Sequence, residues 1–342
     1  MQQSESFSNR WGIILASLAM AIGAGNLWRF PRLAGQYGGS FILLWIVFLL
    51  IWSIPILLAE FSIGKRFKHG TISSFTQLSG KPYTWMGFFI TLCTLFITFY
   101  YSVVTAWSVR YMSFSLQDVI AGIGGSNTLS DNLSSNPDYL KNQWATITNA
   151  DFTTMVINII VVIVGCVLLY KGIQNGLEKA NRIFIPTLFV LLIIISVIAL
   201  TLDGGSKGLE YMFAINPDHF SNPNVWIEAL SQSAWSTGAG WGLIMTISSY
   251  AKEKEDVTLN TFIGGFGNNT ASLMAGMAIL PAVFALAPSE TDALSYLQAG
   301  NQALTFTIIP KLFSTVPGGS YLSLFFFTAF TLAAFSSLLP ML

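Results

Sequence analysis

The chain has 342 residues, of which 53% are hydrophobic and only 9% are charged, and its formal net charge is zero. A soluble domain carries about 25% charged residues, because charge keeps its surface hydrated. This composition excludes an ordinary soluble globular protein, and the scattered basic residues exclude a nucleic-acid-binding surface. A surface so poor in charge indicates lipid as the solvent, so we expect an all-α membrane protein.

Uncharged stretches long enough to cross a bilayer recur along the chain. A transmembrane helix needs about 20 mostly apolar residues. The windows that satisfy this requirement are 11–28, 33–59, 82–109, 152–170, 183–202, 229–251, 257–289 and 312–342. The first window is too rich in glycine and too closely flanked by charge for a cleaved signal peptide. The chain therefore has eight windows that each predict a membrane-spanning helix.

Lysine and arginine are distributed unevenly between the segments that connect these windows. If residues 1–10 are a cytoplasmic lead, the inner segments carry ten of these residues and the outer segments carry six. This bias has the sign of the positive-inside rule. We therefore expect a cytoplasmic N-terminus, with the polar loops 111–151 and 203–224 outside. Within 287–318, the apolar stretch 303–313 predicts a helical lid that dips back toward the bundle.

Groups for catalysis or metal binding are scarce. Cys93 and Cys166 lie within apolar windows, where cysteine behaves as a small hydrophobic residue. His69 and His219 lie in loops, and no His/Cys/Asp cluster has the spacing of a metal site. Ser-His-Asp chemistry has no candidate members at membrane depth. We therefore expect that the protein is not an enzyme.

The first window contains two glycines and an asparagine near its middle, in the run Gly23-Ala24-Gly25-Asn26. Each glycine weakens a helix by up to about 1 kcal/mol relative to alanine, so the run predicts an unwound segment. Unwinding would free carbonyl oxygens to bind Na⁺ and would present N–H groups of the outer half-helix to an anion. Close packing of helices is the alternative interpretation, because small residues also permit it.

Later windows also carry polar groups at membrane depth. The sixth contains Ser236-Thr237-Gly238-Ala239-Gly240, and glycine-interrupted helices in two halves of a chain indicate a transporter site. The seventh contains Asn268-Asn269, for which a functional role and hydrogen bonding between helices are both open. The eighth contains Ser336-Ser337, which is weak evidence alone because serine in a helix bonds to its own backbone.

Together these motifs resemble the neurotransmitter:sodium symporter family. The resemblance extends from about residue 10 to the C-terminus and rests on Gly23–Pro31, Leu58-Ala59-Glu60, Tyr100-Tyr101, Gly172–Lys179, Gln232, Gly240-Trp241-Gly242, Asn268 and Ser336-Ser337. It implies an inverted-repeat fold of the leucine-transporter type, with discontinuous first and sixth helices. It also implies a multi-pass protein of the bacterial cytoplasmic (inner) membrane.

The resemblance divides the chain into three parts. Residues 1–10 are the cytoplasmic lead, 11–202 are the first repeat with helices 1–5, and 203–342 are an incomplete second repeat with helices 6–8. We expect the chain to be truncated within the eighth helix. The helix that usually supplies a partner for an arginine such as Arg29 would then lie outside this chain.

The resemblance also implies two sodium sites and a substrate site. One sodium site comprises the Ala21 carbonyl, Asn26, Ser236, Asn268 and the substrate carboxylate. The other comprises the carbonyls of Ala19, Ile22 and Ala333 and the hydroxyls of Ser336 and Ser337. The substrate site comprises Ala21, Gly23, Gly25, Ile97, Tyr101, Trp235, Ser236, Gly238, Trp241, Ser337 and Met341, and Tyr101 would hydrogen-bond the substrate carboxylate.

The residue at position 23 narrows the substrate. Family members that transport biogenic amines carry Asp where this chain has Gly23, which leaves room for a carboxylate and offers no counter-charge to an amine. We therefore expect a zwitterionic α-amino acid with a hydrophobic or aromatic side chain. Trp235, in place of the usual Phe, would form a bulkier lid over the substrate, and Gly238 would add room at the floor of the pocket.

Chloride dependence stays open. Gln232, Ser236, Asn268 and Ser272 match the residues of chloride-dependent members, and the seventh window contains no carboxylate that would replace the anion. Against chloride, Trp45 stands where those members have a tyrosine hydroxyl.

The sequence thus predicts sodium-coupled symport of a hydrophobic or aromatic α-amino acid into the cell by alternating access. The expected partners are the amino acid, Na⁺ and the lipid bilayer, and the oligomeric state is open. The alternative is a non-transporting amino-acid-binding receptor or a truncated scaffold of the same fold. A channel is disfavoured because the intramembrane polar residues form no rings of like charge.

Overall fold

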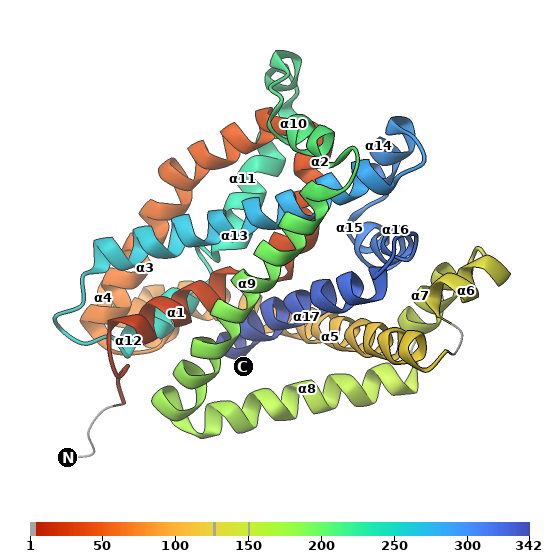
Figure 1. Ribbon diagram of the computed structural model, residues 1–342. Helices are drawn as coiled ribbons and strands as arrows, with labels where there is room; N and C mark the ends of the chain where they lie inside the picture. Colours follow the sequence, from red (N-terminus) through yellow and green to blue (C-terminus); the bar gives the residue numbers. More distant parts are fainter. Residues whose placement is uncertain (1–4, 126–127, 150) are drawn as a thin grey trace.

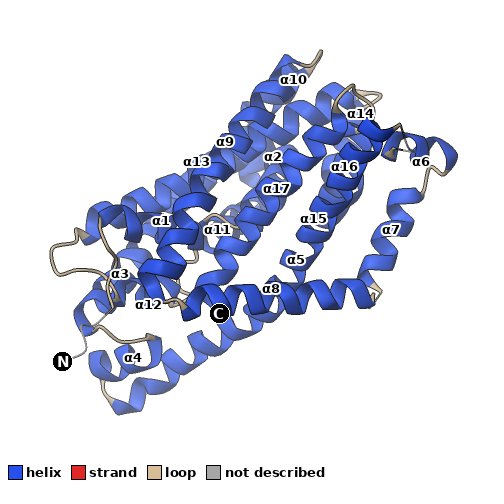
Figure 2. Cartoon of the chain, turned by 60° about the horizontal axis from the view of Figure 1, so that its bottom comes forward, coloured by secondary structure: helices blue, strands red, loops and turns tan. Residues whose placement is uncertain are grey.

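The computed structural model describes residues 5–125, 128–149 and 151–342. Figures 1 and 2 show a bundle of helices, and no strand occurs within these residues. In this part of the chain, six helical segments are long and apolar enough to cross a membrane: Ala24–Phe67, Lys81–Gly124, Phe152–Tyr170, Ile173–Thr201, Val257–Leu286 and Gly319–Met341. The all-α class is confirmed. The first and sixth windows are absent from this set because the structure divides each of them.

The first window is divided at Ile22 and Gly23, at the first of the two glycines. Helix α1 (Arg10–Ala21) ends at the extended residue Ile22, and helix α2 (Ala24–Phe48) begins after Gly23, which is also extended. At Gly38 the φ angle is +57° and the ψ angle is −147°, so α2 bends there. The chain then continues through the π-helix η1 (Leu49–Ser53) into α3 (Ile54–Phe67). The second window therefore follows the outer half of the first with only this bend between them.

The third helix is longer than the sequence predicts. After α4 (Thr71–Ser79) and η2 (Lys81–Tyr83), helix α5 runs over Thr84–Gly124. The expectation that residues from 111 onward form a loop is therefore wrong. Proline is absent from this stretch, and the hydroxyls of Ser113 and Ser115 donate to carbonyls four residues earlier, both at 2.9 Å. Serines bonded in this way remain helical.

The outer connection and the middle of the chain are also helical. The elements are α6 (Leu129–Ser135), α7 (Tyr139–Thr148), α8 (Phe152–Tyr170), the π-helix η3 (Ile173–Glu178), α9 (Lys179–Thr201), α10 (Gly205–Phe213), η4 (Pro217–Ser221), α11 (Pro223–Thr237), α12 (Leu243–Ser249) and α13 (Val257–Leu286). Between α11 and α12, three glycines have positive φ angles of 66°, 89° and 72°: Gly238, Gly240 and Gly242. The predicted discontinuity of the sixth helix is confirmed.

The predicted lid folds onto the bundle as expected. After α14 (Glu290–Gln298) and α15 (Asn301–Ala303), the predicted lid 303–313 forms the π-helix η5 (Leu304–Ile308) and α16 (Ile309–Phe313). Helix α17 (Gly319–Leu338) and η6 (Leu339–Met341) follow. Phe306 is fully buried and stacks on Trp144 with a centroid separation of 4.8 Å. This contact joins the lid to α7.

Helix packing brings the two breaks together in the middle of the bundle. Helix α17 packs along α5 and α9, while α13 packs against α9, α10 and α2 (Figure 1). Helix α11 packs along α2, and α12 packs along α3. The interrupted segments therefore face one another, and α5, α13 and α17 surround them.

A close contact between α3 and α12 makes Gly64 a sensitive position. A Cβ atom at Gly64 would overlap the Met245 carbonyl oxygen and the Ser248 hydroxyl. We expect Gly64→Ala to destabilise the protein by more than about 2 kcal/mol, because the two helices must separate. At Gly70, no heavy atom of the described residues lies within 4 Å of the added Cβ, so Gly70→Ala is the matched control. Thermal unfolding in detergent measures both variants, and equal unfolding temperatures would contradict the contact.

Candidate substrate and ion site

The start of α2 is capped by side chains from within the bundle. Asn26 Oδ1 accepts a hydrogen bond from the Gly23 N–H at 2.9 Å, and the Tyr101 hydroxyl accepts one from the Ala24 N–H at 2.7 Å. The first N–H groups of a helix have no acceptor within that helix. Tyr101 belongs to α5, so a second helix helps to hold the break open. Asn26 and Tyr101 are both buried.

A cluster of buried amides and hydroxyls joins the first break to α11 and α13. Asn26 Nδ2 donates to Asn268 Oδ1 at 2.7 Å and to Ser272 Oγ at 2.8 Å. Asn268 Nδ2 donates to Ser236 Oγ at 3.0 Å. The structure therefore brings together Asn26, Ser236 and Asn268, the side chains that the resemblance assigns to the first sodium site.

Three oxygen atoms in this cluster face one another with no donor group between them. Asn268 Oδ1 lies 3.1 Å from the carbonyl oxygens of Ala21 and Ser236. Turning the Asn268 amide would give these carbonyls a donor, but would bring two amide nitrogens, those of Asn26 and Asn268, to 2.7 Å. Asn26 cannot turn with it without losing the bond from Gly23. A cation between the oxygens removes the conflict, because each oxygen then offers it a lone pair.

A second oxygen cluster lies where α17 meets the end of α1. Ser337 Oγ lies 2.9 Å from the Ala19 carbonyl oxygen and 3.1 Å from that of Ile22. Ser336 Oγ lies 3.1 Å from the Ala333 carbonyl oxygen. One hydroxyl has a single hydrogen and can satisfy only one of the carbonyls around it. The arrangement therefore has the surplus of hard oxygen ligands that a small cation requires.

Two tryptophans lie beside the break at Gly25. A Cβ atom at Gly25 would lie 3.4 Å from Trp235 Cδ1. Trp235 and Trp241 contact each other edge to face, with ring centroids 4.9 Å apart. Trp235 lies near the end of α11, and Trp241 lies just before α12. The two rings form an apolar wall next to the start of α2.

The remaining residues of the expected substrate site lie on three elements. Ile97 is half-buried on α5, one helical turn before Tyr101. The Met341 carbonyl accepts a hydrogen bond from Thr98 Oγ1 at 3.4 Å, so η6 contacts the same face of α5. Gly238 ends α11 with a φ angle of +66°, a conformation that favours glycine whatever the room nearby. The backbone turn, as well as pocket size, therefore requires glycine at this position.

Glu60, one of the residues that carry the family resemblance, contacts the second break. Glu60 is only 5% exposed, and its Oε1 accepts a hydrogen bond from the Gly242 N–H at 3.0 Å. Thr71 Oγ1 also donates to the Gly242 carbonyl, at 3.1 Å. Side chains of α3 and α4 therefore hold the second break.

We expect Glu60→Ala to destabilise the protein by about 1–3 kcal/mol, because it leaves the buried Gly242 N–H without an acceptor. Glu60→Gln keeps an acceptor oxygen at the same place and is the matched control. Unfolding temperature in detergent reports the difference. A Glu60→Gln variant as unstable as Glu60→Ala would show that the hydrogen bond is not the reason.

Arg29 has an ionic partner on α11, a helix other than the one that the resemblance places outside this chain. Arg29 Nη2 lies 2.6 Å from Glu228 Oε2 and 3.0 Å from Ser231 Oγ. Arg29 Nη1 donates to Gln232 Oε1 at 3.4 Å. Glu228 was missed because it directly precedes the sixth window, which was taken to begin at residue 229. Helix α11 in fact begins at Pro223, so Glu228 is one and a half turns inside it.

Two buried donors lie on the helices that carry the candidate chloride residues. Trp45 Nε1 and Gln232 Nε2 have no hydrogen-bond partner in the part of the chain that the structure describes, and both residues are fully buried. Trp45 therefore offers an N–H donor at the position where a tyrosine hydroxyl was expected. Buried donors usually have an acceptor, so an anion or a water molecule would satisfy either of these two.

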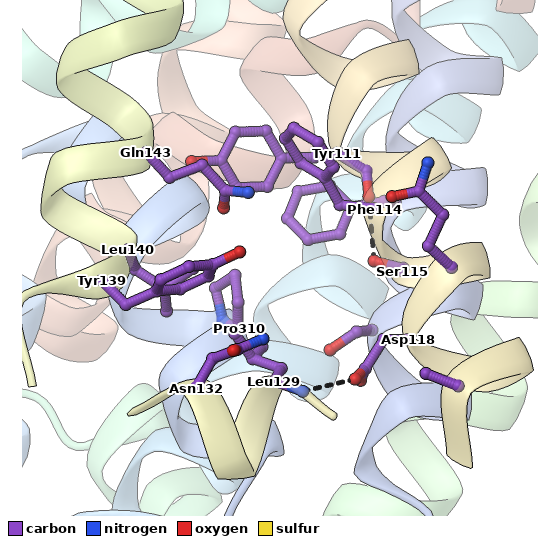
Figure 3. Close-up of a pocket in the computed structure, with 14 residues that line it drawn as sticks. Tyr111, Phe114, Ser115, Asp118, Leu129, Asn132, Tyr139, Leu140, Gln143 and Pro310 are labelled. Carbon is purple, nitrogen blue, oxygen red and sulfur yellow. Dashed lines mark hydrogen bonds between the residues drawn. The ribbon is translucent and has the colours of Figure 1, made fainter. Parts of the chain in front are cut away.

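A separate cavity lies between α5, α6 and α7, and none of the expected site residues lines it. Figure 3 shows α7 facing α5 across a cavity of about 190 Å³, where the Leu129 N–H donates to Asp118 Oδ1 at 2.6 Å. Tyr111 is buried in its wall, and within the described residues its hydroxyl has no partner. This cavity lies apart from both oxygen clusters.

Comparison with known proteins decides the family. The model of the sodium:neurotransmitter symporter family matches residues 4–155 and 126–342. The chain belongs to this family. Its members are transporters and not enzymes, so the predicted family, the inverted-repeat fold of the leucine-transporter type and the absence of enzymatic function are confirmed.

Relatives and solved structures agree with this assignment. An uncharacterized sodium-dependent transporter of Methanocaldococcus jannaschii is 32% identical over 98% of this chain and 67% of its own length. The sodium-dependent neutral amino acid transporter B(0)AT2 of Pongo abelii is 26% identical over 80% of this chain and 40% of its own length. The crystal structure of MhsT in complex with L-phenylalanine matches with a TM-score of 0.84 and 27% identity, covering 99% of this chain and 73% of MhsT.

Proposed function

We propose that the protein couples the movement of Na⁺ to uptake of a hydrophobic or aromatic α-amino acid by alternating access. The observation that carries this proposal is the crowding of oxygen atoms around Asn268, which a cation relieves. The bound amino acid in the MhsT structure and the name of the neutral amino acid transporter support the class of substrate.

The two oxygen clusters are the proposed sodium sites. The first uses the Ala21 carbonyl, Asn26, Ser236 and Asn268, and the substrate carboxylate completes its shell. The second uses the carbonyls of Ala19, Ile22 and Ala333 with the hydroxyls of Ser336 and Ser337. Because the ion and the substrate carboxylate complete each other's coordination, each strengthens the binding of the other.

The substrate carboxylate is proposed to bind at the start of α2. The N-terminal end of a helix attracts an anion through its N–H groups and its dipole. The Tyr101 hydroxyl accepts from Ala24, so its own hydrogen can be donated to the carboxylate. Position 23 carries no acid that would pair with an amine, and even an added Cβ there would overlap that hydroxyl. This favours a zwitterion over a biogenic amine.

Chloride is proposed as the anion that balances the first sodium ion. The partnerless buried donors of Trp45 and Gln232 support it, as does the name of a relative, the human sodium- and chloride-dependent transporter XTRP3, which is 28% identical over 79% of this chain. Replacing chloride with gluconate should weaken sodium-dependent amino-acid binding, and unchanged binding would contradict a chloride requirement.

The proposed division of the chain and its orientation in the membrane are those that the family resemblance implies. Residues 1–10 form a cytoplasmic lead, 11–202 the first repeat and 203–342 part of the second repeat. The protein lies in the bacterial cytoplasmic membrane with its N-terminus inside. The bias of ten inner against six outer basic residues supports this orientation.

Binding of radiolabelled phenylalanine and leucine to the full-length protein tests the proposal. We expect binding in Na⁺ and its loss when K⁺ or choline replaces Na⁺, and we expect no competition from dopamine. Sodium-independent binding, or preference for dopamine, would overturn it. Uptake into proteoliposomes that carry a sodium gradient then separates a transporter from a receptor of the same fold, which would bind but not accumulate the amino acid.

A further inference from the structure

A small cavity lies directly beside the first oxygen cluster, on the side of the N-terminal lead. Its volume is about 10 Å³, and it is enclosed by residues of α1, α3, α11, α12 and α13. A cavity of about this size holds one water molecule when polar groups line it. The lead marks this end of the bundle, because the Phe7 N–H donates to the Tyr250 carbonyl in the loop between α12 and α13.

Three side chains that line this cavity each have an oxygen atom without a hydrogen-bond partner among the described residues. Ser17 Oγ, Asn260 Oδ1 and Thr261 Oγ1 make no hydrogen bond to any residue that the structure describes. Their residues are only 3%, 1% and 4% exposed. A buried polar group without a partner costs about 1–3 kcal/mol, so three around one small cavity would be a large penalty. An occupant of the cavity that bonds to these atoms would remove the penalty.

The chemistry of the three atoms defines that occupant. All are neutral oxygens, and the two hydroxyls can donate as well as accept, whereas the amide oxygen only accepts. A water molecule can donate to the Asn260 oxygen and accept from a hydroxyl. A Na⁺ ion can take a lone pair from each of the three oxygens. The cavity therefore fits water or a small monovalent cation.

The cavity adjoins the first oxygen cluster, because residues of the same elements line both. Ala21, whose carbonyl belongs to that cluster, also lines the cavity. Thr237 lines it and directly follows Ser236, and Gly264 lines it one helical turn before Asn268. An ion that leaves the cluster toward the lead therefore meets these oxygens next.

A carboxylate lies on the far side of the cavity. Asn260 Nδ2 donates to Glu255 Oε2 at 3.4 Å, and Glu255 belongs to the loop between α12 and α13. Lys65 is bonded to the backbone carbonyl of Glu255, at 2.7 Å, so that contact leaves the carboxylate group itself uninvolved. The order of groups is thus ion cluster, neutral oxygens, then the carboxylate of Glu255, which is only 8% exposed. An acid at this place favours a departing cation.

We propose that this cavity is a hydrated transit subsite for the sodium ion that leaves the first site toward the N-terminal end of the bundle. The proposal rests on the proposed sodium coupling. Ser17, Asn260 and Thr261 hold the water, or the ion itself, while the ion exchanges its carbonyl ligands for water. The subsite acts on the rate of ion release and leaves the equilibrium affinity of the first site unchanged.

Two variants alter the cavity by different means. An added Cβ at Gly264 has its nearest neighbour, Ser17 Cβ, at 4.0 Å, so Gly264→Ala fills space without a clash. Thr261→Val removes a hydroxyl at nearly constant volume. Thr270→Val is the matched control, because Thr270 lies on the same helix, is exposed, and bonds its hydroxyl to the Phe266 carbonyl at 2.9 Å.

The test compares equilibrium and rate in the full-length protein. In Gly264→Ala and Thr261→Val, we expect the Na⁺ concentration for half-maximal amino-acid binding to stay within about twofold of wild type. We expect release of ²²Na⁺ from proteoliposomes to slow by about fivefold in Thr261→Val, as the loss of one hydrogen bond along the path predicts. Gly264→Ala should also slow release, because its methyl group takes up the space of the occupant. Unchanged release in both variants, with sodium-dependent binding intact, would overturn the subsite alone. Sodium-independent binding by the wild type would overturn the proposed function and the subsite together.

Diffraction from crystals soaked in Tl⁺ distinguishes the two occupants. An anomalous peak between Ser17, Asn260 and Thr261 would identify a cation, and an ordered water without such a peak would identify hydration alone. Either result supports the subsite. A dry cavity would overturn it.

Discussion

Asn26→Leu is expected to abolish sodium-dependent amino-acid binding by the full-length protein. The substitution removes an acceptor for the Gly23 N–H and the donor to Asn268 and Ser272. It also removes one oxygen from the proposed first sodium site. Three buried groups lose their partner at about 1–3 kcal/mol each, so we expect the apparent affinity to fall by more than about 100-fold. Scintillation proximity binding of a labelled amino acid over a range of Na⁺ concentrations measures this effect.

The control for Asn26→Leu removes an amide from another membrane-spanning helix. Asn158 lies on α8. In the described part of the chain, the only hydrogen bond of its side chain is to Ser102 Oγ, at 3.4 Å. Asn158→Leu should therefore bind the amino acid as the wild type does. If Asn26→Leu also retained sodium-dependent binding, the amide cluster would not be the ion site.

Gly23→Ala should have a comparably large effect, through volume alone. An added Cβ would overlap the Tyr101 hydroxyl and lie 2.9 Å from Ser337 Oγ. It would thus displace one group of the proposed substrate site and one of the proposed second sodium site. We expect the affinity for the amino acid to fall by more than about 100-fold, because neither neighbour belongs to a flexible surface side chain.

Gly25→Ala is the matched comparison, two residues along the same segment. Its Cβ would lie 3.4 Å from Trp235 Cδ1, which is an ordinary van der Waals contact. Equilibrium binding should therefore fall much less in Gly25→Ala than in Gly23→Ala. Equal losses would show that the backbone of the break, and not the space beside Tyr101, decides the result.

The breaks in the helices were predictable because their cause is local. Gly23, Gly25, Gly238 and Gly240 weaken a helix wherever they occur, and the tertiary structure uses these weak points. The residues that hold the breaks open were harder to find. Tyr101 was assigned to the substrate through the family resemblance, and its bond to the Ala24 N–H depends on how α5 packs against α2.

Contacts between distant segments explain what the sequence did not predict. Glu60 follows an apolar window and resembles a residue at a helix end, yet its partner is the Gly242 N–H, 182 positions further along the chain. The length of α5 was underestimated because its outer third is polar, and polarity alone was taken as a sign of a loop. The donor of Trp45 was overlooked because only the missing tyrosine hydroxyl was considered.

The ion pair between Arg29 and Glu228 has a mechanical consequence. It joins the outer halves of the two broken helices, α2 and α11, which also pack along each other. A tilting motion that carries both halves together leaves this ion pair intact. The contacts that change on opening are then those of α2 and α11 with α13 and α17. Spin labels on α2 and α11 should therefore keep a constant separation, while their distances to α9 change.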